Sequence, residues 1–276
     1  MKTLMFFGLS ISFSLLSCSS EMEVFTALPN GQKVSSIKVV YHDEYGDMPE
    51  YDGKYYSWVE FDRKGRIKDI MRGTLQENPD YKSSEFLTRP YTQFSINNMV
   101  WYLDYGFYPD VSLLAYGPDG WANQKAKEYD RFANHGIMVK RDFNNNPIEI
   151  SSTSEAGHTR PFGFNEQFIY ADNGKLTLWK SAHNIRLPSG EENSSYHSKQ
   201  FAYNESGQVV SIREENNAIL ISYENDNVVE VKLEKNGVVH LRHEYFYNDM
   251  GLRTKSITYN TRNEKEFSQE YEYRYF

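Results

Sequence analysis

The heptapeptide YNESGQV, residues 203–209, carries the pattern that decides the fold: an aromatic residue, a polar turn that ends in glycine, and an aliphatic residue. Repetition of such a short pattern indicates one supersecondary unit that is used several times along the chain. The further copies, of which the last two replace the glycine, are FDRKGRI at 61–67, YADNGKL at 170–176, YNDMG at 247–251, YENDNV at 223–228 and FNNNPI at 143–148.

Each copy reads as a β-hairpin, in which the aromatic residue ends one strand and the aliphatic residue opens the next. The turn requires a residue with positive φ, which glycine adopts without steric cost and asparagine tolerates better than most residues. We assign this turn position to five residues: Gly65, Gly174, Gly207, Asn227 and Gly251.

The segments between the turns alternate apolar and polar residues, which is typical of antiparallel strands with one buried face. Val229, Val231 and Leu233 alternate with charged residues in this way. His240 and His243 fall on opposite sides of one strand, so they cannot chelate one metal ion, and we expect both to be solvated. The pattern predicts a mostly β fold, in which antiparallel hairpin repeats form a curved sheet or barrel.

The start of the chain has the features of a bacterial export signal. Lys2 precedes an uncharged apolar run over residues 4–16, which is shorter than the roughly 20 residues that a membrane-spanning helix needs. The run ends at Leu15-Leu16-Ser17-Cys18, which resembles the bacterial lipobox and contains the only cysteine of the chain. We expect a signal peptide over 1–17, a lipidated Cys18, and a tether over 18–35.

Composition limits the environment and the partners of the mature protein. Loss of residues 1–17 removes one lysine, so the formal charge of −8 becomes −9, and the acidic chain has no basic block. Nucleic acid and anionic lipid headgroups are therefore poor candidate partners. Ser19 next to the cysteine, followed by a short acidic stretch, indicates the outer membrane or cell surface, with lipid as the membrane anchor.

The repeat copies resemble the YD repeats of bacterial Rhs-type and wall-associated proteins, whose core is Tyr-Asp, two variable residues and Gly-Arg-Leu. The resemblance loosely covers residues 37–73 and 140–276, and FDRKGRI is the best copy. Asn or Ala often replaces Asp and the unit length varies, which argues against a long, regular Rhs shell. In size and signal the chain is similar to Bacteroidota lipoproteins with degenerate YD-like repeats, some of them described as porin-like β folds. This resemblance implies architecture only.

Residues 74–135 contain no copy of the motif, and we treat them as a small helical or irregular insert in a repeat domain over 36–276. After Gly117-Pro118-Asp119-Gly120, apolar residues recur at helical spacing, which predicts a helix of about 12 residues with Asp119 available as its cap. The segment either caps an open end of the sheet, which we favour, or forms an aromatic platform for a glycan or peptide. The candidate ligand-binding residues of that platform are Trp101, Tyr105, Tyr108 and Trp121.

Sequence motifs of catalysis and cofactor binding are missing: the chain has no nucleophile elbow, phosphate loop, dinucleotide fingerprint or zinc-protease motif. The acidic residues between 43 and 52 do not match the spacing of a calcium loop, and we expect a solvated turn there. We therefore predict no catalytic residue, no metal site and no cofactor. The expected function is a non-catalytic envelope lipoprotein, either structural or binding an extracellular glycan or protein. The alternatives are an outer-membrane-associated, pore-like barrel component or, third, a secreted glycan-active enzyme.

Overall fold

The computed structural model describes residues 24–25, 28, 30–46, 49, 52–71, 94–95, 100–101, 103, 111–130, 136–152, 162–186 and 192–276. Within this part the chain forms a 14-stranded antiparallel sheet, a two-stranded parallel pair and helix α3 (Val111–Asp130). The predicted mostly β fold of antiparallel hairpins is confirmed. The predicted lipidation site Cys18 and the candidate ligand residues Tyr105 and Tyr108 lie outside the described residues.

The described strands form one short parallel pair and the antiparallel hairpins of the large sheet. The parallel pair joins β1 (Val24–Phe25) to β5 (Phe94–Ser95). The strands of the sheet are β2 (Val34–Asp43), β3 (Lys54–Phe61), β4 (Ile67–Met71), β6 (Ile137–Arg141), β7 (Pro147–Ser152), β8 (Phe162–Tyr170), β9 (Leu176–Arg186), β10 (Glu192–Tyr203), β11 (Val209–Glu214), β12 (Asn217–Glu224), β13 (Asn227–Lys235), β14 (Val238–Tyr247), β15 (Arg253–Tyr259) and β16 (Lys265–Tyr275).

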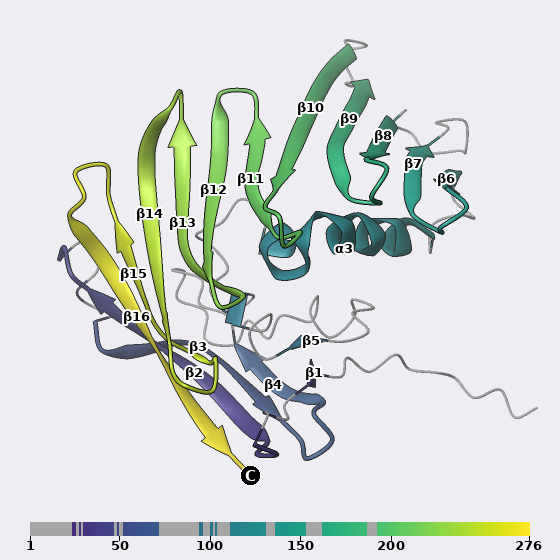
Figure 1. Cartoon of the computed structure of the whole chain (residues 1–276). Helices are drawn as coiled ribbons and strands as arrows, with labels where there is room; N and C mark the ends of the chain where they lie inside the picture. Colours follow the sequence, from purple (N-terminus) through teal and green to yellow (C-terminus); the bar gives the residue numbers. More distant parts are fainter. Residues whose placement is uncertain are drawn as a thin grey trace, which may run out of the picture.

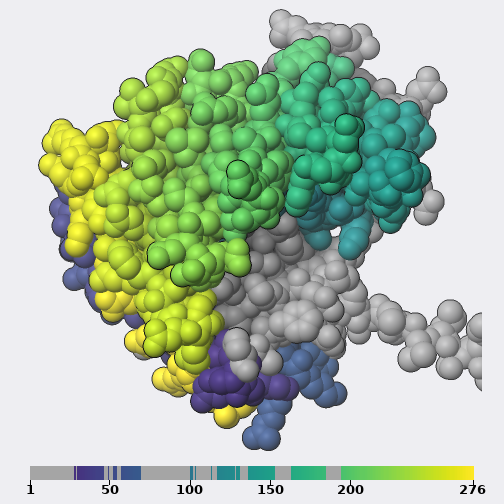
Figure 2. All heavy atoms as spheres, in the orientation of Figure 1, coloured from purple at the N-terminus to yellow at the C-terminus, as the bar shows by residue number. Residues whose placement is uncertain are grey.

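Sheet order follows chain order from β6 to β16, because each hairpin adds its strands beside the previous hairpin. The N-terminal strands break this rule: β2 pairs with β16, and β3 and β4 follow outward. The Phe276 amide donates to the Lys33 carbonyl over 3.1 Å, which extends this pairing to the last residue. Figure 2 shows the result, with the purple strands of the N-terminal part beside the yellow C-terminal ones.

The sheet is curved and open (Figure 1). Among the described strands β4 and β6 form its two edges, and they do not pair with each other. Of the two predicted forms, the curved sheet is therefore correct and the closed barrel is not. No helix in the described part is long and apolar enough to cross a membrane.

Six turns of the described chain share one hydrogen-bond pattern that explains the repeat motif. After β10, the Asn204 amide donates to the Gln208 carbonyl and the Gly207 amide to the Asn204 carbonyl, each over 3.0 Å. The Asn204 side chain accepts the Gln208 amide over 2.9 Å, so an Asp or Asn here satisfies an amide that the turn exposes. Turns with the same two backbone bonds begin at Asp62, Asp142, Ala171, Asn248 and Asn260.

Positive φ occurs at Gly65, Gly174, Gly207 and Gly251, but not at Asn227. The left-handed residues of that hairpin are Asn225 and Asp226, and Asn227 pairs with Glu224 as the first residue of β13. A tight two-residue turn with two positive φ values replaces the longer repeat turn here, because its twist matches that of the flanking strands.

The variant at 143–148 does not follow the frame read in the sequence, because its aromatic position is taken by Arg141, two residues before Phe143. Its turn begins at Asp142 and has its positive φ at Asn145, so Phe143 lies on the turn and is 95% exposed. A further copy at 259–264, YNTRNE, was missed because Asn263 stands in the glycine position, with φ 61°. The signal that identifies this copy is Tyr259-Asn260 with a second asparagine, Asn263, three residues later.

The aromatic position of the repeat is often tyrosine because its hydroxyl joins neighbouring hairpins. Tyr203 donates to the carbonyl of Leu176 over 2.7 Å, and Leu176 is the aliphatic residue that opens the strand after the preceding repeat turn. Tyr223 and Tyr247 bond in the same way to the carbonyls of Val209 and Val228, over 2.9 and 2.8 Å. Tyr273 extends the series to the Arg253 carbonyl over 2.7 Å. These four bonds form a tyrosine ladder along the sheet.

Helix α3 lies against the concave face of the sheet (Figure 1). Gly117 has φ 68° and ψ 168°, which kinks the element just before Pro118. The Asp119 carboxylate accepts the Leu176 amide at the start of β9 over 2.7 Å, so Asp119 ties the helix to the sheet. The buried core continues along the concave side and includes Val39, Val59, Ile150, Phe168, Trp179, Phe201, Val231 and Tyr245.

Candidate functional site

Trp101 and Trp121 do not present their rings to solvent, as the predicted aromatic platform requires. They are 4% and 7% exposed. The Trp121 ring lies 5.3 Å from that of Trp179 in an edge-to-face arrangement, and Trp101 lies 5.0 Å from Tyr245 in the same way. Both tryptophans therefore contribute packing against the concave face of the sheet and are not available as a binding surface.

Strands β8, β9 and β10 carry an exposed depression on the face that points away from α3. Its volume is about 380 Å³. Because side chains alternate along a strand, the neighbours of the buried Phe168 and Trp179 point outward and line this depression. The outward-facing lining side chains are Asn165, Gln167, Lys180, Ala182, Tyr196 and Ser198.

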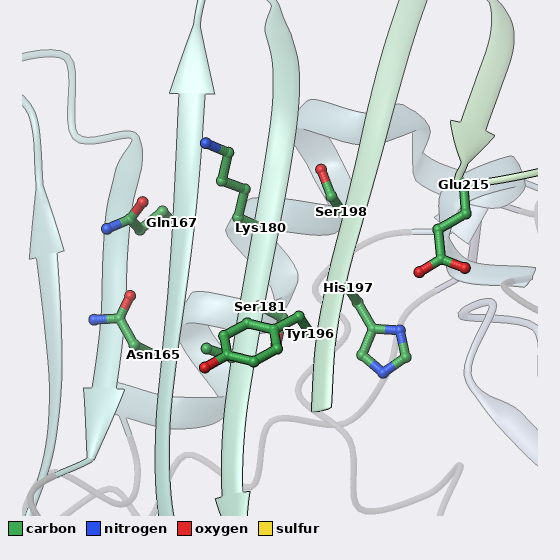
Figure 3. A pocket seen from close by; sticks show the side chains of 9 residues that line it. Asn165, Gln167, Lys180, Ser181, Tyr196, His197, Ser198 and Glu215 are labelled. Carbon is green, nitrogen blue, oxygen red and sulfur yellow. The ribbon is translucent and has the colours of Figure 1, made fainter. Parts of the chain in front are cut away.

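Tyr196 is the main aromatic surface of the depression. Its side chain is 71% exposed, although tyrosine carries a large apolar ring. Figure 3 shows the ring lying across β9, which carries Lys180, with Asn165 and Gln167 beyond it on β8. We name this site the Tyr196 depression. It combines one flat ring with amide, amine and hydroxyl groups, which donate and accept hydrogen bonds.

The border of the Tyr196 depression toward β11 is formed by His197 and Glu215. The His197 ring nitrogen Nδ1 lies 3.0 Å from the Glu214 carboxylate, which orients the imidazole. β11 pairs with β10 only over residues 200–203, so among the described strands β10 has a partner on one side alone at residues 192–199. The depression therefore lies beside the part of β10 that is not paired with β11.

The opposite face of the same strands holds a buried ion pair. Glu166 is 1% exposed, and its Oε2 lies 2.7 Å from the Lys125 ammonium of α3 and 2.9 Å from the Trp179 indole nitrogen. The Lys125 ammonium also lies 4.6 Å from the Trp179 ring centre. These contacts fix α3 against β8 and β9, and they hold the floor of the Tyr196 depression in place.

A serine and a histidine lie close together beside this ion pair. The Ser181 hydroxyl is 2.6 Å from His183 Nε2, and the His183 ring stacks on Phe164. Burial lowers the pKa of His183 from its ordinary value, more than the Glu166 carboxylate raises it. Ser181 is 2% exposed, so its hydroxyl is out of reach of a substrate carbonyl in this structure.

The acidic turn singled out in the sequence borders a second, polar depression of about 350 Å³. His42 lies 3.7 Å from Asp52 and 3.8 Å from Glu270, and Ser268 donates to Glu44 over 3.1 Å. Within the described residues no three His, Cys, Asp or Glu side chains are placed to hold one metal ion. Of the two histidines of β14, His240 is exposed as expected, whereas His243 is buried on the concave face and the prediction that it is solvated was wrong.

Sequence reasoning missed the Tyr196 depression. The segment ENSSYHSK at 192–199 contains no repeat motif and no regular apolar alternation. One signal was available: an isolated aromatic residue in a run of small polar residues indicates an aromatic side chain without apolar neighbours on its own strand. Only the pairing of β8, β9 and β10 reveals which side chains surround it.

The chain matches no protein-family model and no curated protein. Among solved structures it is similar to a porin-like protein from Bacteroides uniformis, with 12% identity, a TM-score of 0.30, and coverage of 43% of this chain and 48% of that one. It is also similar to the structure titled TcdB2-TccC3-TEV, with 15% identity, a TM-score of 0.32, and coverage of 44% of this chain and 5% of that one. The matched parts thus span less than half of either of these proteins.

Proposed function

We propose that this protein is exported, is anchored to a membrane through lipid on Cys18, and binds a saccharide in the Tyr196 depression without catalysing a reaction. The observation that carries the proposal is the 71% exposed ring of Tyr196 inside a depression lined by amide, amine and hydroxyl groups. Exposure of an aromatic ring to water is unfavourable in free energy, and a ligand that covers the ring removes this surface from water.

The chemistry of the lining favours a saccharide over an apolar ligand. A sugar ring has an apolar face that stacks on an aromatic ring and a rim of hydroxyl groups that need hydrogen-bond partners. Asn165, Gln167 and Ser198 supply both donors and acceptors, and Lys180 supplies donors. The groups come from three paired strands, so their spacing is set by the sheet and changes little on binding.

The test is a glycan panel applied to the mature protein, followed by titration of each bound glycan against variants. Tyr196→Ala removes the ring, and we expect a loss of affinity of about tenfold, from a stacking contribution of about 1 kcal/mol plus lost apolar contact. The matched control is Phe246→Ala, which removes another exposed aromatic side chain from β14. Equal affinity of Tyr196→Ala and wild type for every bound glycan, or no bound glycan at all, contradicts the proposal.

Anchoring is tested separately. Cys18→Ala removes the only thiol that can carry lipid, so the variant should leave the membrane fraction while its melting temperature stays that of the wild type. Ser20→Ala, two residues away, is the control and should remain in the membrane fraction. A Cys18→Ala variant that still sediments with membranes would show that another part of the chain holds it there.

A further inference from the structure

The register of β8, β9 and β10 arranges the outward side chains of the Tyr196 depression in two adjacent rows. The first row holds Gln167, Lys180 and Ser198, and the second holds Asn165, Ala182 and Tyr196. Residues two positions apart on one strand lie about 7 Å apart along it. Ala182 has a small side chain, and the Tyr196 ring lies across β9 in Figure 3. A ligand that covers this ring is therefore one row away from the Lys180 side chain.

The charge of Lys180 is not balanced in the way that the charges of other outward lysines are. Lys140 on β6 stands opposite Glu149 on the adjacent strand, at 2.8 Å, and Lys255 on β15 stands opposite Glu270, at 3.1 Å. The residues opposite Lys180 carry instead an amide on β8 and a hydroxyl on β10. Within the described part of the chain the Lys180 ammonium makes no ion pair, so it is an uncompensated positive charge at the depression.

The nearby carboxylates do not cancel this charge. Glu149 lies in the same row as Lys180 but two strands away, and it is bound by Lys140 and by the Asn165 amide over 2.8 and 3.1 Å. Glu215 borders the depression, and Figure 3 places it on the far side of β10 from Lys180. The field across the depression therefore favours an anionic group at the Lys180 end and disfavours one at the Glu215 end.

We propose that the Tyr196 depression takes an anionic saccharide, whose ring stacks on Tyr196 and whose carboxylate or sulfate group pairs with Lys180. This inference rests on the proposed saccharide binding and adds the charge of the ligand. Both anionic groups present several acceptor oxygens, and the ammonium has three donors for them. The Gln167 amide and the Ser198 hydroxyl, which flank Lys180 in its row, can donate to the same group.

The acidic chain limits how many charges the ligand carries. The formal net charge is −8, so the surface as a whole repels a densely charged polyanion. Salt screens exposed charges within about 10 Å, which confines the attraction of Lys180 to the depression itself. A saccharide with one anionic group near the stacked ring fits these conditions.

The experiment uses methyl glycosides of the gluco, galacto and manno configurations, each in three forms that differ only at carbon 6: a neutral alcohol, a carboxylate and a sulfate ester. Affinity for the mature protein is measured by ligand-observed NMR titration. At low salt we expect an anionic form to bind about fivefold more tightly than its neutral counterpart, the factor that an exposed ion pair supplies. High salt should shrink this difference. The form that binds most tightly distinguishes a carboxylate ligand from a sulfate ligand.

Variants assign the preference to one side chain. Lys180→Gln removes the charge and keeps a polar side chain, so it should abolish the difference between the anionic and neutral forms. Lys180→Arg retains the charge and should keep most of the difference. Lys232→Gln is the matched control, since it removes an outward lysine from β13 that is paired with Glu230, and it should behave as the wild type. Tyr196→Ala should weaken the binding of every form.

The outcomes separate this inference from the saccharide proposal. Equal affinities of the wild type for the neutral and anionic forms overturn the anionic ligand alone, provided that Tyr196→Ala still weakens binding. A preference that Lys180→Gln retains also overturns it, because another group would then attract the anion. Binding of no glycoside, or equal binding by Tyr196→Ala and the wild type, overturns both.

Discussion

The tyrosine ladder predicts that removal of a single oxygen atom weakens the contact between neighbouring hairpins. In Tyr223→Phe the ring stays in place, but the 2.9 Å bond to the Val209 carbonyl is lost. A neutral hydrogen bond contributes about 1 kcal/mol net, and the carbonyl left without its donor adds to the cost. Burial raises the pKa of Tyr223 to about 12, which agrees with a phenol held away from water.

The loss of unfolding free energy grows when several bonds of the tyrosine ladder are removed together. Tyr203, Tyr223 and Tyr247 bond to three different carbonyls in three hairpins. If their effects add, the triple Phe variant should lose about 3 kcal/mol of unfolding free energy, and its melting temperature should fall by roughly 6–12 °C for a chain of this size.

Chemical denaturation with urea, followed by circular dichroism, measures this loss directly, and the slope of the transition should stay constant because the surface exposed on unfolding does not change. Tyr196→Phe is the control, since that phenol is exposed and outside the ladder. A triple variant within about 0.5 kcal/mol of this control, a typical effect of surface substitutions, would refute the reasoning. The ladder would then be a consequence of sheet packing and not a cause of stability.

Three further predictions follow from single sites. His243 has a folded-state pKa of about 4 against an ordinary 6.5, so the unfolded chain binds a proton first as the pH falls. About 3 kcal/mol of unfolding free energy present above pH 6.5 should therefore disappear as the pH falls to 4. Urea titrations at stepped pH measure this dependence of stability on pH, and His243→Asn should flatten it. Gly207→Ala places a Cβ at φ 78° and should cost about 1 kcal/mol, whereas Gly163→Ala in β8, with open space and no positive φ, should cost almost nothing; equal melting temperatures would contradict this. Lys125→Met strands the buried Glu166 carboxylate and should cost about 3 kcal/mol, most of which the double variant with Glu166→Gln should recover; no recovery in a double-mutant cycle would place the cost elsewhere.

The local features of the fold were predictable because their causes lie within a few residues. An Asx residue, two variable positions and a glycine close a turn through bonds that span four residues, as at Asn204 to Gln208. Alternation of apolar and polar residues then fixes which side of each strand is buried. The errors at Asn227 and Phe143 are also local, since a stretch rich in Asn and Asp fits more than one turn frame.

The candidate site was not predictable in the same way. The repeat motif places Tyr196 on no hairpin turn, and its neighbours Asn165 and Lys180 come from other strands. The predicted platform of Trp101 and Trp121 is buried, because exposure of an aromatic ring depends on what packs over it. Apolar composition alone does not distinguish a cap from a binding surface.

The sequence by itself determined that the chain is built from antiparallel hairpins, with Asp or Asn and glycine at the turns, since short-range hydrogen bonds and steric limits on φ act within each copy. Only the tertiary structure decided that β16 pairs with β2, that the sheet stays open between β4 and β6, and that Tyr196 is exposed while Arg253 is enclosed. Such choices depend on contacts between residues as far apart as Glu44 and Ser268, whose formation is governed by the shape and burial of whole faces. No local pattern records which faces meet, because many pairings satisfy the same alternation.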